Sequence, residues 1–197
     1  IKVQLPYNPS STDWDKQCQV LKQQLEGVLN DGFDFINIVI TAGPSDSFLS
    51  SVRRNGKFCF LLCNWGADYA DPETWTDPFS TDSSYSFIFK STDPETQALY
   101  AEYTELVAAA KAITDDMDAR YAAFAKAEAF LLDHAFAIPF SISNRSYQMC
   151  NLNVFEGQYA SFGVANQRYK DQHLYSSSMG LEEYQDAYAE WQSKKAG

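Results

Sequence analysis

An apolar run that leads into acidic and aromatic residues constrains this chain more than any other feature. Residues 58–63 are apolar and long enough for one strand, and residues 64–67 end the run. The chain then enters a cluster of acidic and aromatic side chains: Asp68, Tyr69, Asp71 and Trp75. Open α/β sheets bind ligands just outside the carboxyl ends of their strands, so the segment predicts a ligand-binding corner. A core strand followed by a polar turn is the alternative, since Asp-Pro at 71–72 is ordinary turn chemistry.

The composition limits the classes of partner. The 197 residues are 45% hydrophobic, enough for one large domain or two small ones with a core. The formal charge of −11, from 15 Lys and Arg against 26 Asp and Glu, argues against a nucleic-acid partner and a polybasic membrane surface. No apolar stretch approaches the roughly 20 residues that cross a bilayer, so we expect a soluble chain with no direct membrane contact. The chain opens with Ile1, directly in a strand-like segment and without a signal peptide. We therefore expect it to be cut from something longer.

The four cysteines do not predict a metal site. Cys18, Cys59, Cys63 and Cys150 form no Cys-x-x-Cys pair, and the two histidines, His134 and His173, do not cluster with them. In an extended strand Cys59 and Cys63 would lie about 13 Å apart, too far for a disulfide. Buried free thiols are expected.

The first third of the chain alternates strands and helices. Strands are predicted over residues 1–7, over 36–40 and from Phe58. Between the first two, a helix capped at Thr12 or Asp13 carries an apolar stripe: Trp14, Cys18, Leu21, Leu25 and Val28. Between the last two, a short helix from Ser45 to residues 55–56 carries Phe48, Leu49 and Val52. This order predicts crossover units and a sheet with parallel pairs.

Two longer helices follow an ordered loop at residues 71–92. Asp93 caps the first, with Pro94 at its first helical position. The apolar stripe of this helix consists of Leu99, Tyr103, Leu106, Ala110 and Ile113. Residues 114–116 turn and cap the second, whose inward residues are Met117, Tyr121, Phe124, Leu131 and Ala135. Glu128 is expected at the margin of that stripe. A further strand is predicted over residues 137–143, no assignment is made for 144–180, and residues 181–191 form a final amphipathic helix.

Motifs for catalysis are missing from the sequence. It contains no Gly-x-Gly-x-x-Gly, phosphate loop, Gly-x-Ser-x-Gly or His-Glu-x-x-His. His134 falls at the end of a predicted helix, where a structural role is expected. Asp68 and Asp71 could form a hydrolase acid pair, but nothing else supports one. We expect a protein that is not an enzyme and uses no cofactor.

The segment 64–73, Asn-Trp-Gly-Ala-Asp-Tyr-Ala-Asp-Pro-Glu, resembles the Gly-Trp-x-Ala-Asp-Tyr-x-Asp-Pro signature of family 5 extracellular solute-binding proteins. These are the oligopeptide- and dipeptide-binding receptors of ABC importers. Residues 47–60 and 114–140 resemble the segments that flank the signature, in the same order. The likeness covers residues 1 to about 145, with a weaker match at 169–171.

The resemblance implies an α/β fold, a periplasmic-binding-protein-like (type II) lobe with a mixed, mostly parallel sheet flanked by helices. In this family two lobes close over the ligand, and the signature belongs to the second. Residues 1–175 would be that lobe, residues 176–197 a C-terminal amphipathic helix and tail, and the first lobe would be missing.

The family's site residues map onto the signature. Asp68 falls on the carboxylate that pairs with the α-ammonium of a peptide, a charge-assisted contact. Asn64 and Gly66 fall on the main-chain positions that add the peptide as an extra strand. Trp65 would pack beside the site, and Tyr69 would line it. Where some members carry a basic residue that clamps the peptide's carboxylate, this chain has Leu61 and Leu62. Residues 27–35 also look longer than usual for the family.

The resemblance favours a binding protein that captures oligopeptides and delivers them to an ABC permease. It would act at the outer face of the cell membrane as a lipoprotein, or in a periplasm, with any membrane anchor outside this chain. The same fold binding an oligosaccharide is the first alternative, because Trp65, Tyr69 and Trp75 could stack on sugar rings. Asp68 discriminates between the two, since a carboxylate suits an ammonium better than a neutral sugar. A hydrolase is the second alternative.

Overall fold

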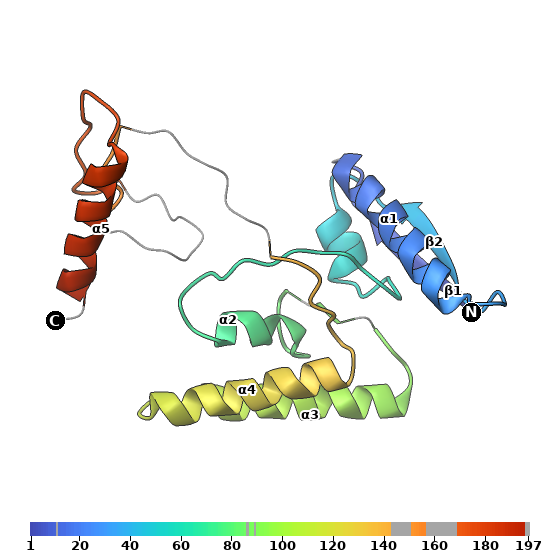
Figure 1. Ribbon diagram of the computed structural model, residues 1–197. Helices are drawn as coiled ribbons and strands as arrows, with labels where there is room; N and C mark the ends of the chain where they lie inside the picture. The colour runs from blue at the N-terminus through green and yellow to red at the C-terminus, as the bar shows by residue number, and fades with distance from the viewer. Residues whose placement is uncertain (11, 86, 89, 143–150, 157–168, 196–197) are drawn as a thin grey trace. The chain divides into compact units, whose positions relative to one another are not determined.

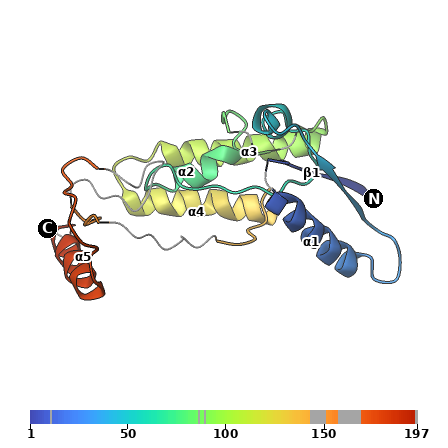
Figure 2. The same cartoon turned by 90° about the horizontal axis from the view of Figure 1, so that it is seen from above.

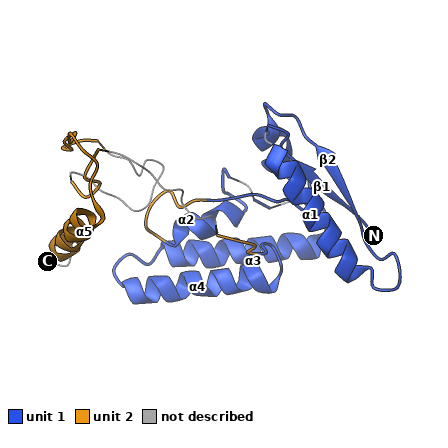
Figure 3. Cartoon of the chain, turned by 45° about the horizontal axis from the view of Figure 1, so that its top comes forward, with its two compact units in different colours: residues 1–65, 72–138 blue, residues 66–71, 139–197 orange. Residues whose placement is uncertain are grey.

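The computed structural model describes all residues except 11, 86, 89, 143–150, 157–168 and 196–197. Two compact units are present (Figure 3). The first unit comprises residues 1–65 and 72–138, and the second comprises residues 66–71 and 139–197. Each is described by itself.

A small parallel sheet covered by one helix opens the first unit (Figure 1). β1 (Lys2–Tyr7) pairs with β2 (Asn37–Ala42), with Leu5 opposite Ile40, and α1 (Thr12–Leu29) connects them. Their core consists of three buried residues: Leu5, Cys18 and Ile38. The predicted crossover and the parallel pairing are therefore confirmed, and the fold is a mixed α/β one.

Polar side chains of α1 fasten the helix to β2. Glu26 accepts hydrogen bonds from the Ile38 amide and from Lys22, both at 2.6 Å. The Lys22 hydrogen bond, followed by that from Ile38, lowers the pKa of the Glu26 carboxyl. The apolar contact ends one turn earlier than predicted: Leu25 packs on the core, whereas Val28 is 75% exposed. The stripe was predicted one turn too long because the last turn of α1 continues past the cluster.

The strand predicted from Phe58 is wrong. Residues 58–63 carry no strand, although Phe60 and Leu62 pack against the β1–β2 core. One ladder-like bond joins this segment to β1, from the Phe60 amide to the Gln4 carbonyl at 3.1 Å. In a parallel ladder the next bond would run from the amide of residue 6 to the Phe60 carbonyl. Residue 6 is Pro6, which has no N–H, so the ladder stops after one bond.

The short helix expected near residues 45–55 is a π-helical turn, η1 (Leu49–Arg53). Phe48 and Val52 are buried as the stripe predicts, whereas Leu49 is exposed. Gly43 makes room for this turn, because a Cβ there would lie 2.6 Å from the Phe48 ring.

Two long helices lie side by side and form the larger core of the first unit (Figures 1 and 2). Asp93 caps α3 (Pro94–Lys111) through the Thr96 amide at 2.8 Å, and Asp116 caps α4 (Met117–Asp133) through the Ala119 amide at 2.9 Å. Both caps were predicted. The core between the helices contains six buried residues: Tyr103, Val107, Ala110, Phe124, Ala127 and Leu131.

The inward face of α4 differs from the prediction at three positions. Met117 and Tyr121 are exposed, and Arg120 is buried in the place expected for Tyr121. Arg120 is buried because its guanidinium donates hydrogen bonds to carbonyls at the end of α3. Ala135 follows the helix end at His134 with φ of 56°, in the left-handed region, and is exposed. Glu128 is exposed, as expected at the margin.

The strand predicted over residues 137–143 is also wrong within the part that the structure describes. Residues 137–142 carry no strand, and the alternating apolar side chains Ile138, Phe140 and Ile142 are exposed, the last at 95%. Alternation alone makes no strand: a strand needs a neighbour, and no strand among the described residues pairs with this segment. The described part of the loop predicted at residues 71–92 contains the short helices α2 (Glu73–Thr76) and η2 (Asp77–Phe79).

The second unit is built around α5 (Leu181–Lys195), the predicted final helix. Its rings Tyr184, Tyr188 and Trp191 surround Phe155, with centroid distances of 5.1, 5.4 and 5.8 Å. No residue of α5 is buried.

The described cysteines are free thiols, but only Cys18 is buried. Cys59 and Cys63 are exposed, contrary to the expectation, because they lie in the segment that forms no strand. Cys150 lies outside the described residues.

A buried hydrogen bond ties α2 to the helical core. The Tyr103 hydroxyl donates to the Thr76 carbonyl at 2.8 Å. Tyr103→Phe should lower the free energy of unfolding by about 1–2 kcal/mol, because the buried carbonyl loses its donor. Urea unfolding followed by fluorescence measures this, with Tyr121→Phe, at an exposed position of α4, as the control. Equal stability of the two variants would contradict the assignment.

Two buried tyrosines of α3 predict alkaline unfolding. Burial raises the pKa of Tyr100 to about 12, and burial also raises that of Tyr103. An unfolded tyrosine ionises near pH 10, so the native state favours the neutral phenols. Their contribution is complete below about pH 10 and is lost as the pH rises toward about 12. Urea midpoints should fall across this window, and less steeply in Tyr100→Phe. A flat profile would contradict the prediction.

Candidate functional site

The predicted ligand-binding segment leaves and re-enters the first unit at two points that are bonded to each other. Residues 66–71 join Trp65 to Pro72. The Trp65 indole N–H donates to the Thr74 carbonyl at 2.6 Å, and Thr74 is buried. Compact loops whose ends meet in this way are frequently functional. We call residues 66–73 the signature loop, and Trp65 with Thr74 its base.

Aromatic packing holds the Trp65 side of the base. The centre of the Trp65 ring lies 4.5 Å from that of Tyr85 and 5.3 Å from that of Phe87, and both pairs are edge to face. Phe87 in turn contacts Phe79 at 5.5 Å. Such pairs contribute about 0.5–1.5 kcal/mol each beyond their burial. Trp65 is therefore a fixed support of the loop, held by its ring and by its N–H.

Arg53 is a buried cation in contact with this aromatic cluster. The Arg53 guanidinium stacks 4.5 Å from the centre of the Phe87 ring, and the residue is 8% exposed. Every Asp and Glu of the chain lies among the described residues, and none of these side chains pairs with Arg53. Burial lowers the pKa of Arg53, the nearby Cys63 thiol opposes that shift, and Arg54 adds to it. The ring face of Phe87 is thus the contact that stabilises this charge.

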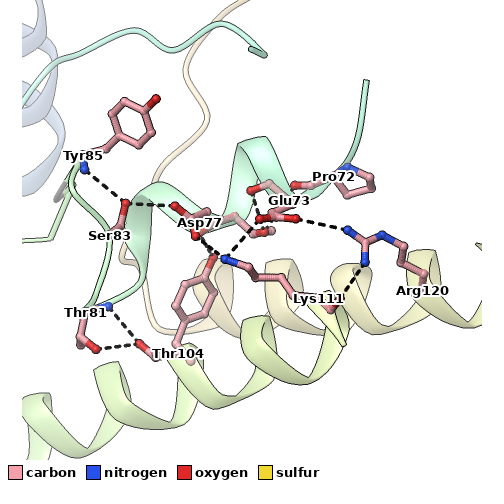
Figure 4. Close-up of polar contacts among 11 residues, drawn as sticks. Pro72, Glu73, Asp77, Thr81, Ser83, Tyr85, Thr104, Lys111 and Arg120 are labelled. Carbon is pink, nitrogen blue, oxygen red and sulfur yellow. Dashed lines mark hydrogen bonds and ion pairs between the residues drawn. The ribbon is translucent and has the colours of Figure 1, made fainter. Parts of the chain in front are cut away.

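Ion pairs of Glu73, the residue before Thr74, hold the other end of the signature loop (Figure 4). The Glu73 carboxylate contacts Lys111 of α3 at 3.2 Å and Arg120 of α4 at 3.3 Å. Lys111 also contacts Asp77 at 2.9 Å, and Asp77 accepts a hydrogen bond from Ser83 at 3.2 Å. The hydrogen bonds that Lys111 donates to Asp77 and Glu73 raise the pKa of Lys111, with the bond to Asp77 the largest cause. The network joins α2, η2, α3 and α4.

Arg120 serves α3 as well as Glu73. One guanidinium nitrogen donates to the carbonyls of Ala110, Lys111 and Ile113, at 3.2, 3.1 and 2.9 Å. The last carbonyls of a helix lack partners within it, so Arg120 caps the end of α3. This requirement explains why Arg120, and not Tyr121, faces inward.

The five residues predicted for the site lie on both sides of the unit boundary. Asn64 and Trp65 belong to the first unit, whereas Gly66, Asp68 and Tyr69 belong to the second. Asn64 and Gly66 are exposed, and no atom lies within 4 Å of where a Cβ on Gly66 would be. Asp68 is half-buried and Tyr69 is 49% exposed. None of the five residues is therefore buried.

Sequence reasoning missed Glu73, Lys111 and Arg120. A charge within an apolar helical stripe was the available signal, since Arg120 lies four residues before the buried Phe124.

The described residues hold neither a metal-binding cluster nor a membrane-spanning helix. No cluster of three or more His, Cys, Asp or Glu there could hold a metal ion. Of the helices there, none has the length and apolar character needed to span a membrane.

Comparisons with known proteins extend the resemblance. No protein-family model matches the chain. The chain is 28% identical to the oligopeptide-binding protein AmiA of Streptococcus pneumoniae, with 100% of the chain and 32% of that protein aligned. It is 26% identical to the oligopeptide-binding protein SarA of Streptococcus gordonii and 28% identical to AliA of S. pneumoniae, over 100% and 99% of the chain. The predicted resemblance is confirmed. The chain spans about a third of the length of these relatives.

The Trp65–Thr74 hydrogen bond gives a prediction for the signature loop. Trp65→Phe keeps a ring but removes the N–H donor, so the base should loosen and the Thr74 carbonyl should lose a partner. We expect faster amide exchange and faster proteolysis within residues 66–73, measured by mass spectrometry. Trp75→Phe, at an exposed position of α2, is the matched control. Unchanged exchange in Trp65→Phe would show that the indole does not hold the loop.

Proposed function

We propose that this chain is the second lobe of a family 5 solute-binding protein that captures oligopeptides for an ABC importer. The observation that carries the proposal is the match of essentially the whole chain to three oligopeptide-binding proteins. The signature segment at residues 64–73, which lies within that match, supports it as well. The chain acts as a binding protein, without chemistry on the peptide.

Asp68 receives the α-ammonium of the peptide. Asp68 is half-buried, which suits this role, because a charge-assisted hydrogen bond is stronger when water is partly excluded. Full burial would have closed the carboxylate to a ligand.

The backbone of residues 64 and 66 binds the peptide main chain. Asn64 and Gly66 are exposed, whereas the ring of Trp65 between them is anchored. Alternate residues of an extended chain face the same side, so both can pair with a peptide added as a strand. Recognition through the main chain leaves the peptide's side chains loosely read. Tyr69 lines the same site.

The remaining parts of the receptor complete the site. A first lobe, outside these residues, closes over the peptide, with residues 1–175 as the second lobe and residues 176–197 as a C-terminal helix and tail. The receptor delivers its peptide to the permease at the outer face of the membrane, as a lipoprotein with an anchor outside this chain, or in a periplasm. The exposed rings of Tyr69 and Trp75 favour one other ligand, an oligosaccharide stacked on them.

Asp68→Asn in the two-lobed protein tests the ligand class. Peptide affinity should fall by an amount on the order of 2–5 kcal/mol, because the buried ammonium loses its counter-charge. N-acetylation of the peptide should weaken binding to the unaltered protein similarly and should make little further difference in Asp68→Asn. Calorimetry measures each dissociation constant.

Asp82→Asn, at an exposed position outside the signature loop, is the control and should bind as the unaltered protein does. An unchanged affinity in Asp68→Asn would end the amine role, and tighter binding of an oligosaccharide than of any peptide would favour the alternative. Cleaved peptide after incubation would contradict a binding function.

A further inference from the structure

We propose that Glu73 is a positioning residue for the peptide site: its ion pairs fix where the signature loop rejoins the folded core. The inference rests on the proposed function, because it concerns how residues 64–69 are presented to a peptide.

Glu73 lies at the exit of the loop and is held from two helices. It follows Pro72 directly and occupies the first turn of α2. Lys111 of α3 contacts one carboxylate oxygen at 3.2 Å, and Arg120 of α4 contacts the other at 3.3 Å. The two oxygens are thus pulled toward different helices, which fixes the direction of the carboxylate as well as its position (Figure 4).

The two cations cannot easily follow a displaced carboxylate. Arg120 is 8% exposed and is held by three carbonyls at the end of α3 and by the Phe124 ring, 4.9 Å away. Asp77 holds Lys111 at 2.9 Å. A change at Glu73 therefore shifts the loop and not the helices.

The entrance of the loop is coupled to the same point. Thr74, whose carbonyl accepts the Trp65 N–H, is the residue after Glu73. Adjacent residues of one helical turn thus fix both ends of the loop, the exit through ion pairs and the entrance through the indole. Neutralising Glu73 loosens the turn that carries the Thr74 carbonyl, and with it the support of Trp65.

A pre-positioned loop binds more tightly because less conformational freedom is lost on binding. The ion pairs are partly buried, with side-chain exposures of 10% for Arg120 and 25% for Glu73, so water screens them less than a surface pair. A purely structural role predicts lower stability with unchanged affinity. A positioning role predicts lower affinity that depends on Asp68.

The experiment is a double-mutant cycle in the two-lobed protein, read as the dissociation constant of a peptide with a free α-amine. Glu73→Gln should weaken binding on the order of tenfold. In the Asp68→Asn background the same change should weaken it only about twofold, since the group being positioned is already gone. Glu190→Gln is the control, because Glu190 pairs with Lys194 at 2.6 Å on the exposed surface of α5.

Thermal unfolding of the unliganded variants separates stability from affinity. If Glu73→Gln lowers the melting temperature but leaves the dissociation constant unchanged, the positioning role is overturned. Where Asp68→Asn itself weakens binding, equal losses from Glu73→Gln in both backgrounds would overturn it too. Lys111→Gln, which keeps the Arg120–Glu73 contact, replaces Glu73→Gln if that variant does not fold, and should weaken binding about threefold; no loss there overturns the inference.

Failure of the proposed function is a distinct result. If Asp68→Asn alone leaves the dissociation constant unchanged, Asp68 does not receive the amine. A tenfold loss from Glu73→Gln in the same series would still support its positioning of the main-chain groups at residues 64 and 66.

Discussion

The contact on which the first unit depends is made by one buried guanidinium. Arg120 caps the end of α3 through three carbonyls, lies over Phe124 of its own helix, and reaches Glu73 at the start of α2. Three helices thus meet at one side chain. Burying an Arg costs free energy unless its donors are satisfied, and here the carbonyls at the end of α3 and a carboxylate satisfy Arg120 together. Because Glu73 ends the signature loop, the same contact links the helical core to the candidate site.

One proline, Pro6, limits the hydrogen bonding on one side of β1. The odd residues of β1 bond to β2, as the bonds from Asn37 to Ile1 and from Gly43 to Tyr7 show. Its even residues face the other way, toward residues 58–63, and one of them is Pro6. A proline there removes a ladder donor from that side, so an apolar run that reads as a strand packs beside β1 without joining it. The position of Pro6 was visible in the sequence, and combining it with the alternation of strand residues would have corrected the prediction.

Contacts between residues close in the sequence were predictable, whereas contacts between residues far apart in the sequence were not. The caps Asp93 and Asp116 act on amides three residues away, so the sequence alone located both helices. In the stripe of α4, Phe124 and Leu131 are buried as predicted, but Arg120 is buried in place of Tyr121 because it caps the end of another helix. Likewise the signature located residues 64–69, but the tie from Glu73 to Arg120 spans 47 residues and has no local pattern. Contacts of this kind become visible only when the fold brings the helices together.

The candidate site combines an anchored residue, Trp65, with exposed neighbours on either side of it. Asn64 and Gly66 are exposed, while the indole between them is held by Tyr85, Phe87 and the Thr74 carbonyl. The anchored Trp65 ring restrains the backbone of Asn64 and Gly66, because both are bonded directly to Trp65. In the proposed receptor, main-chain recognition of varied peptides would need a rigid backbone and few side-chain contacts. The aromatic contacts of Trp65 and the ion pairs of Glu73 would supply that rigidity at the two ends of the loop.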